Sequence, residues 1–328
     1  MNKFVKRGCT VLLALTLALG MSVSAFAAVE PTVKKDYQLT NPGTTSPEET
    51  FTFEVKAKSM TEAFDEDGNV LDVDDMPALT IDPAHYAGGG AGSENEVQNL
   101  TISHTDPFPN VGVYTYTVKE TKGNTAGVTY NTNEMQLDVI VTHGEGDELV
   151  ERYNFYPDAN NADKGDTIVN KYSAGSLIVE KQVTGKFGDK NKSFNFSVTF
   201  NVTDDKTVNS TISYGTQSIT PEAMADGQET VYFSLKDGEK MEFKNVPYGV
   251  TYTVTEDDYT GQGYDVPTYD ENQNGTIKAA TVSTTVINNN PTAVNTGVIL
   301  HSAPYVLLLV GVGAAAVAFL ILKKHREV

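Results

Sequence analysis

Cysteine is almost absent from this sequence, which has one cysteine, Cys9, in 328 residues. Cys9 lies close to the N-terminus and has no lipobox around it, so we do not expect it to carry a lipid. The rest of the chain therefore cannot form a disulfide bond. It needs some other means of resisting unfolding.

Histidine and the motifs of hydrolytic enzymes are also scarce. Away from the two ends the chain has only His85, His104 and His143, and it has no Gly-x-Ser-x-Gly nucleophile motif. A hydrolase built on a carboxylate pair stays an alternative, but no such pair is marked out by its setting. We therefore expect a protein that is not an enzyme and that needs no cofactor.

Positive charge is in short supply as well. The chain has 24 Lys and Arg residues against 43 Asp and Glu residues, a formal net charge of −19. Such a surface repels nucleic acid and anionic membranes, which excludes nucleic acid as a partner.

The N-terminus has the features of a secretory signal peptide. Lys3, Lys6 and Arg7 precede an apolar stretch at residues 11–19, and the small residues Ala25 and Ala27 suit a cleavage site. We therefore expect residues 1–27 to be removed on export.

The C-terminus has the features of a membrane anchor. Residues 305–322 are eighteen uncharged, mostly apolar residues, about enough for one transmembrane helix, and a basic cluster follows at 323–326. The segment 293–297 resembles the sorting signal that sortases of Gram-positive bacteria cut between Thr and Gly, here Thr296 and Gly297. Ala-Val stands where that signal usually has Leu-Pro, and an ordinary uncleaved anchor is the alternative.

Between the two ends the pattern is that of β-strands. Short runs of alternating Val, Thr, Tyr and Phe are separated by Gly, Asn, Asp and Pro, with no long helical periodicity, which predicts antiparallel β-sandwiches. The pattern occurs twice, because these segments correspond in order: residues 33–35 with 179–181, 51–55 with 194–198, 116–120 with 252–256, and 168–170 with 286–288.

These repeats predict an all-β chain of two tandem domains, at residues 28–172 and 173–291, followed by the sorting and anchor segment at 292–328. The short linker predicts a stiff rod. The first domain carries an insertion at residues 64–95. Its acidic part lacks the Gly and the final Glu of a calcium loop, so we expect a solvated loop and no metal site.

Each half has a lysine on its first strand, a glutamate late in its middle and an asparagine on its last strand. Alternation along the strands puts all of them on core-facing positions. The two sets are Lys35, Glu120 and Asn170, and Lys181, Glu256 and Asn288.

Burial of such a set favours a reaction between its members. Desolvation lowers the pKa of a lysine and raises that of a glutamate, so the amine becomes a neutral nucleophile and the carboxyl a proton carrier. Held against an asparagine amide, the amine can form an isopeptide bond and release ammonia. Glu120 and Glu256 would then be the catalytic residues of a reaction that happens once per domain.

Alternatives to these assignments stay open. The lysines could be edge charges and the glutamates solvated, although the repetition of all three residue types in both halves argues against it. Lys34 adjoins Lys35, and Asn289 and Asn290 adjoin Asn288; alternation and the repeat favour Lys35 and Asn288.

With these residues and the C-terminal signal, the chain resembles Gram-positive backbone pilins, most closely the streptococcal T-antigen type with two isopeptide-bonded, immunoglobulin-like domains. The second half is also similar to CnaB-type domains at residues 233–238 and 246–256. The resemblance implies polymerisation by a sortase, which passes Thr296 to a lysine of the next subunit. The matching position here is Lys164, with Lys171 and the lysines of residues 186–192 as competitors.

The resemblance also implies the partners and the location: a sortase, neighbouring pilin subunits, peptidoglycan at the base of the pilus, and the cell surface of a Gram-positive bacterium. A monomeric wall-anchored adhesin of the same fold is the alternative function. A ligand on a host surface, if there is one, is expected at the first-domain insertion.

Overall fold

The computed structural model describes residues 30–61, 71–89, 96–161 and 163–291. The expected signal peptide, Thr296, Gly297 and the expected membrane span lie outside this part of the chain. Within the described ranges no helix is long and apolar enough to cross a membrane.

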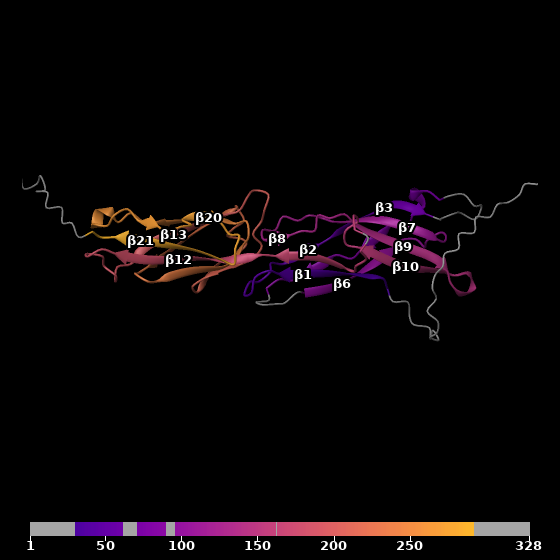
Figure 1. Ribbon diagram of the computed structural model, residues 1–328, viewed down its shortest axis with the longest axis horizontal. Helices are drawn as coiled ribbons and strands as arrows, with labels where there is room; N and C mark the ends of the chain where they lie inside the picture. Colours follow the sequence, from indigo (N-terminus) through magenta and orange to yellow (C-terminus); the bar gives the residue numbers. More distant parts are fainter. Residues whose placement is uncertain (1–29, 62–70, 90–95, 162, 292–328) are drawn as a thin grey trace, which may run out of the picture.

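The described chain is all-β and forms two β-sandwiches arranged end to end (Figure 1). The first sandwich packs a five-stranded sheet, in the order β4-β6-β1-β11-β8, against a four-stranded sheet, in the order β10-β9-β7-β3. The strands of the five-stranded sheet are β4 (Leu79–Ile81), β6 (Glu96–His104), β1 (Thr32–Leu39), β11 (Thr167–Tyr172) and β8 (Val128–Thr129). Those of the four-stranded sheet are β10 (Leu149–Tyr156), β9 (Met135–His143), β7 (Gly112–Glu120) and β3 (Phe53–Thr61).

The second sandwich has the same plan, with a six-stranded sheet, β15-β14-β17-β12-β21-β19, facing a four-stranded sheet, β16-β13-β18-β20. The strands of the six-stranded sheet are β15 (Gln217–Ile219), β14 (Ile212–Tyr214), β17 (Lys240–Pro247), β12 (Ala174–Thr184), β21 (Thr281–Asn289) and β19 (Thr268–Tyr269). Those of the four-stranded sheet are β16 (Gln228–Leu235), β13 (Phe194–Asn201), β18 (Thr251–Glu256) and β20 (Asn274–Thr276).

The alternating residues of the sequence become alternately buried and exposed in each sandwich. Val33, Lys35 and Tyr37 of β1 are buried, while the residues between them are more exposed. Successive side chains of a strand point to opposite faces of the sheet, so the apolar face of each sheet covers the other. Lys35 therefore lies inside the core as a result of its position in the strand.

The first and last strands of each sandwich are neighbours in the middle of one sheet and run parallel. β1 pairs with β11 in the first sandwich, and β12 pairs with β21 in the second. This pairing brings side chains that are more than a hundred residues apart in the sequence to the same buried face.

Two details differ from the sequence pattern. Residues 51–55 were expected to form one strand, but the chain leaves β2 (Glu49–Phe51) at Thr52 and enters β3 in another sheet. The insertion at residues 64–95 contains two short strands, β4 and β5 (Ala84–Tyr86), with buried side chains. β4 pairs with β6 at the edge of the five-stranded sheet, and β5 pairs with β2.

The two sandwiches are joined closely. Only Ser173 separates β11 from β12, and its carbonyl accepts a hydrogen bond from the Tyr248 backbone at 2.9 Å. The buried Tyr172 hydroxyl donates to Ser210 Oγ at 2.9 Å, and Asn245 Oδ1 accepts from the Thr45 backbone at 3.0 Å. These contacts cross the joint on several sides, which supports the stiffness expected from the short linker.

Candidate functional site: two buried lysine–glutamate–asparagine clusters

The first cluster is assembled from both sheets of the first sandwich. Lys35 lies on β1 and Asn170 on the neighbouring β11, where Asn170 is paired with Tyr37. Tyr37 lies two residues after Lys35, and residues two apart in a strand point to the same face of the sheet. The Lys35 and Asn170 side chains therefore lie side by side. Glu120 reaches them from the end of β7 in the opposite sheet, and all three residues are buried.

The carboxyl of Glu120 connects the other two side chains. Lys35 Nζ donates to Glu120 Oε2 at 2.9 Å, and Asn170 Nδ2 donates to Glu120 Oε1 at 2.6 Å. Lys35 Nζ also contacts Asn170 Oδ1. The backbone N–H of Asn131 donates to Glu120 Oε1 at 3.0 Å and fixes the orientation of the carboxyl. One carboxyl oxygen thus faces the amine and the other faces the amide nitrogen.

An aromatic ring shields the amine from solvent. Lys35 Nζ lies 4.3 Å from the centre of the Phe51 ring, and the ring packs against Tyr37, Tyr86 and Tyr130. Burial lowers the pKa of Lys35 to about 8, although the Glu120 charge acts in the opposite direction. The neutral form of this amine is therefore more accessible than that of a lysine in water.

The second cluster repeats this geometry. Lys181 lies on β12, and Asn288 lies on β21, where it is paired with Val183, again two residues beyond the lysine. Lys181 Nζ contacts Asn288 Oδ1 and lies 3.3 Å from Oε1 of Glu256, which reaches it from β18. Phe194 takes the place of Phe51, with its ring centre 4.4 Å from Lys181 Nζ.

The two clusters differ in how the carboxyl is held. Apart from the ion pair of its Oε1 with Lys181, Glu256 has no hydrogen-bond partner for its carboxyl oxygens among the described residues, and no backbone N–H holds it as Asn131 holds Glu120. Lys181 Nζ instead donates to the carbonyls of Gln182 and Val286, both at 3.2 Å. Burial lowers the pKa of Lys181 and raises that of Glu256, so both groups are shifted toward their neutral forms.

The neighbouring candidates do not reach the lysines. Asn289 Nδ2 donates to Asp265 Oδ2 at 2.7 Å, away from Lys181. Lys34 forms an exposed ion pair with Asp166 at 2.7 Å.

Of the candidate acceptor lysines, Lys164 and Lys171 are exposed, and Lys190 is paired with Asp237 at 3.1 Å. No cluster of three metal-ligating acidic, His or Cys side chains occurs within the described ranges.

The sequence patterns did not assign a role to Phe51 and Phe194. Both open the Phe-x-Phe-x-Val segment that the two halves share, so the repeat contained the signal. Only the fold shows that each ring lies against a lysine amine. A neutral amine held in this way against an amide, beside a carboxyl, is an arrangement from which a new amide bond can form.

Each of the two sandwiches lies in a part of the chain that matches a known domain family. Residues 31–173 match the family described as the Spy0128-like isopeptide containing domain. Residues 175–290 match a domain of unknown function, DUF7601.

Beyond single domains, the chain is similar to pilus proteins of Streptococcus pyogenes. The chain is 27% identical over 331 residues to a protein named pilin of Streptococcus pyogenes serotype M1, covering 91% of this chain and 96% of the relative. A crystal structure of the major pilin from Streptococcus pyogenes has a similar fold, with a TM-score of 0.54 and 24% identity over 81% of this chain and 100% of that one. Over 80 residues the chain is also 35% identical to the pilus tip adhesin Cpa of Streptococcus pyogenes, covering 24% of this chain and 11% of the adhesin.

The comparisons confirm the resemblance to streptococcal major pilins that the sequence indicated. The pilin relatives are structural proteins, in agreement with the expectation that the chain is not an enzyme.

Proposed function

We propose that this protein is a structural subunit of a sortase-assembled pilus on a Gram-positive cell surface, and that each of its domains is closed by one Lys–Asn isopeptide bond. The similarity to a pilin over 91% of the chain supports the pilus role. The observation that carries the proposal is the repeated geometry: in both sandwiches a buried lysine and a buried asparagine lie two residues apart in register on paired first and last strands.

The proposed reaction in the first domain joins Lys35 to Asn170. The neutral Nζ attacks Cγ of Asn170 and loses a proton to Glu120 Oε2, 2.9 Å away. The carboxyl, now protonated, passes this proton on to Nδ2, which lies 2.6 Å from Oε1. The Cγ–Nδ2 bond then breaks, ammonia leaves, and an Nζ–Cγ amide bond remains. No oxidant or cofactor is required.

The same reaction in the second domain joins Lys181 to Asn288, with Glu256 as the proton carrier. The raised pKa of Glu256 favours the protonated carboxyl that is needed to deliver a proton to the leaving nitrogen. The crosslinks would replace the disulfides that this chain cannot form.

Polymerisation would occur in a separate step. The sortase would cut after Thr296 and pass its carbonyl to an amine of the next subunit, for which we propose Lys164. This lysine is exposed on the segment that leads into β11, six residues before Asn170. Sortase, the neighbouring subunits and peptidoglycan at the base would then be the partners of the protein.

The intact mass of the chain from Ala28 to Thr296 tests the crosslinks. The expected mass is lower than the sequence mass by two molecules of ammonia, one for each crosslink. Proteolytic fragments should contain residue 35 bonded to residue 170, and residue 181 bonded to residue 288. A mass equal to the sequence mass would rule out both bonds.

Assembly is tested separately by expressing the full chain together with a pilus sortase in a Gram-positive host. A ladder of high-mass species on a denaturing gel is expected, and it should disappear when the sortase is omitted. A single wall-linked species would favour the alternative, a monomeric anchored adhesin.

A further inference from the structure

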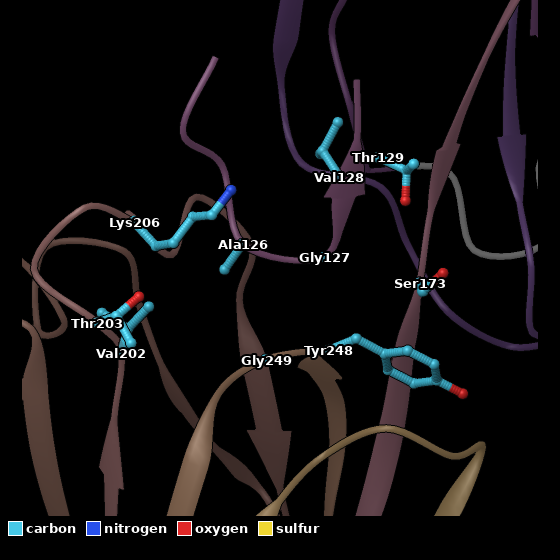
Figure 2. Close-up of a pocket in the computed structure, with 10 residues that line it drawn as sticks. All are labelled: Ala126, Gly127, Val128, Thr129, Ser173, Val202, Thr203, Lys206, Tyr248 and Gly249. Carbon is cyan, nitrogen blue, oxygen red and sulfur yellow. The ribbon is translucent and has the colours of Figure 1, made fainter. Parts of the chain in front are cut away.

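A loop of the first sandwich completes the core of the second. Residues 121–130, called here the docking loop, leave β7 after Glu120 and return to the first site at Asn131. At its tip, Ala126 is 3% exposed and belongs to the hydrophobic core cluster of the second sandwich. Figure 2 shows Ala126 and Gly127 between Lys206 on one side and Ser173 and Tyr248 on the other.

Hydrogen bonds from the second domain hold the tip. The Ala126 N–H donates to the Thr207 carbonyl at 2.8 Å, and the Thr207 N–H donates to the Asn124 carbonyl at 3.0 Å. Asn209 Nδ2 donates to Thr125 Oγ1 at 2.9 Å. Gly127 has a φ of +80° and no room for a side chain, because a Cβ atom there would lie 2.6 Å from the Ser173 carbonyl oxygen. The second domain therefore holds the tip of the loop, while β8, further along the loop, pairs with β11 of the first domain.

The base of the docking loop belongs to the first crosslinking site. Its last residue is followed by Asn131, whose N–H holds Glu120 Oε1 at 3.0 Å. Tyr130 accepts a hydrogen bond from the Thr125 N–H at 3.3 Å through its hydroxyl, and its ring lies 6.0 Å from that of Phe51, centre to centre. Phe51 in turn lies against Lys35 Nζ. Two sets of contacts thus run from the tip of the loop to the reacting groups.

We propose that the docking loop is a positioning element for the first site, so that Lys35 reacts with Asn170 at its full rate only when the second domain has folded around Ala126. This inference rests on the proposed crosslinks. Without the second domain, the tip of the loop loses its hydrogen bonds to Thr207 and Asn209 and its burial. The pairing of β8 with β11 and the hydrogen bond from Tyr130 to Glu49 remain, but Asn131 and Tyr130 lose part of the support that orients Glu120 and Phe51.

The second site has no comparable dependence. Neither oxygen of Glu256 accepts a backbone hydrogen bond among the described residues, and Lys181 is held by carbonyls of its own domain. The second crosslink is therefore expected to form first, although the first domain leaves the ribosome and the membrane earlier.

The test follows both crosslinks during cell-free synthesis of the chain from Ala28 to Thr296. Samples are quenched in denaturant at intervals and digested, and the two crosslinked peptides are quantified by mass spectrometry. The decisive variant is Asn209→Ala, a change in the second domain that removes a hydrogen bond to the tip of the loop. Its control is Asn274→Ala, an exposed asparagine of the same domain.

In Asn209→Ala we expect the first crosslink to form about fivefold more slowly, the effect of roughly one lost hydrogen bond on a rate, with the second crosslink unchanged. Ala126→Asp, which places a charge in the core of the second domain, should slow the first crosslink further, whereas Ala225→Asp at an exposed turn should not. A first crosslink formed at the normal rate in Asn209→Ala would overturn the inference. Equal slowing of both crosslinks would also overturn it, because the effect would then be general destabilisation.

The same experiment separates this inference from the proposed function. If the unaltered chain forms neither crosslinked peptide, the proposed chemistry is wrong. If it forms both and Asn209→Ala leaves their rates unchanged, only the role of the docking loop is wrong.

Discussion

Lys181 Nζ lies 4.4 Å from the centre of the Phe194 ring, and the lysine side chain is inaccessible to solvent. Lys35 and Phe51 have the same relationship in the other domain, at 4.3 Å. A charged amine in such a place is costly, because the ring and the core replace its water. The core of each domain therefore favours the neutral form of its lysine by keeping water away.

Replacing either glutamate should affect only its own domain. Glu120→Gln keeps the size of the side chain but cannot accept the proton from Lys35, so the first crosslink should slow by about 10² to 10⁴-fold while the second forms normally. Glu256→Gln should do the reverse. Quantification of the two crosslinked peptides measures both effects. Glu54→Gln, on the exposed side of β3, is the control, and loss of a crosslink in this variant would contradict the assignment.

The first crosslink should form faster as the pH rises. Burial lowers the pKa of Lys35 to about 8, so its neutral, reactive fraction increases with pH and levels off above that value. An uncrosslinked chain kept in denaturant can be diluted into buffers between about pH 5 and pH 10, and the loss of ammonia followed by mass. A rate that falls with rising pH in this range would show that neutral Lys35 is not the nucleophile.

Removing a crosslink should destabilise its domain strongly. Asn288→Ala prevents a bond that would close a separation of 107 residues in the second domain. By analogy with a disulfide closing a loop of that length, the free energy of unfolding should fall by about 4 to 5 kcal/mol. Denaturant titration of the second domain measures the change. Asn289→Ala, which removes the hydrogen bonds to Asp265 and Thr184, should cost about 1 to 2 kcal/mol, and an equal loss in both variants would point to Asn289 instead.

Lys164→Arg should abolish the sortase-dependent ladder. Arginine keeps the charge, but its guanidinium stays protonated and cannot act as the acceptor amine. Lys171→Arg is the matched control, since Lys171 is also exposed and lies close by in the sequence. Gel analysis of cells that express the sortase distinguishes the two. Loss of the ladder in Lys171→Arg alone would transfer the acceptor role to Lys171.

The buried clusters could be predicted from the sequence because each depends on local alternation and on a repeat. Lys35 and Asn170 have core-facing positions in strands whose pattern is evident, and Lys181 and Asn288 repeat them. Alternation alone does not reveal which strands become neighbours. The expected bond between a lysine of the first strand and an asparagine of the last strand, however, required these two strands to lie close together.

Other features depend on tertiary structure and had no local signal. The break at Thr52 arises because β2 and β3 join different partners, although residues 51–55 alternate without interruption. The docking loop contains a small apolar residue, Ala126, whose burial depends on a core supplied by the other domain. Neither strand propensity nor alternation within one domain can indicate such a contact.

The proposed crosslinks would also change what a single cut in the backbone can do. A protease that cleaves anywhere between Lys35 and Asn170, or between Lys181 and Asn288, would leave the two fragments joined through the isopeptide bond. Only one stretch between the domains, residues 171–180, would be a single covalent thread. In that stretch Tyr172, Ala174, Leu177 and Val179 are fully buried. A cut that separates the two domains would therefore have to fall in the buried strands β11 and β12, where a protease cannot bind an extended chain.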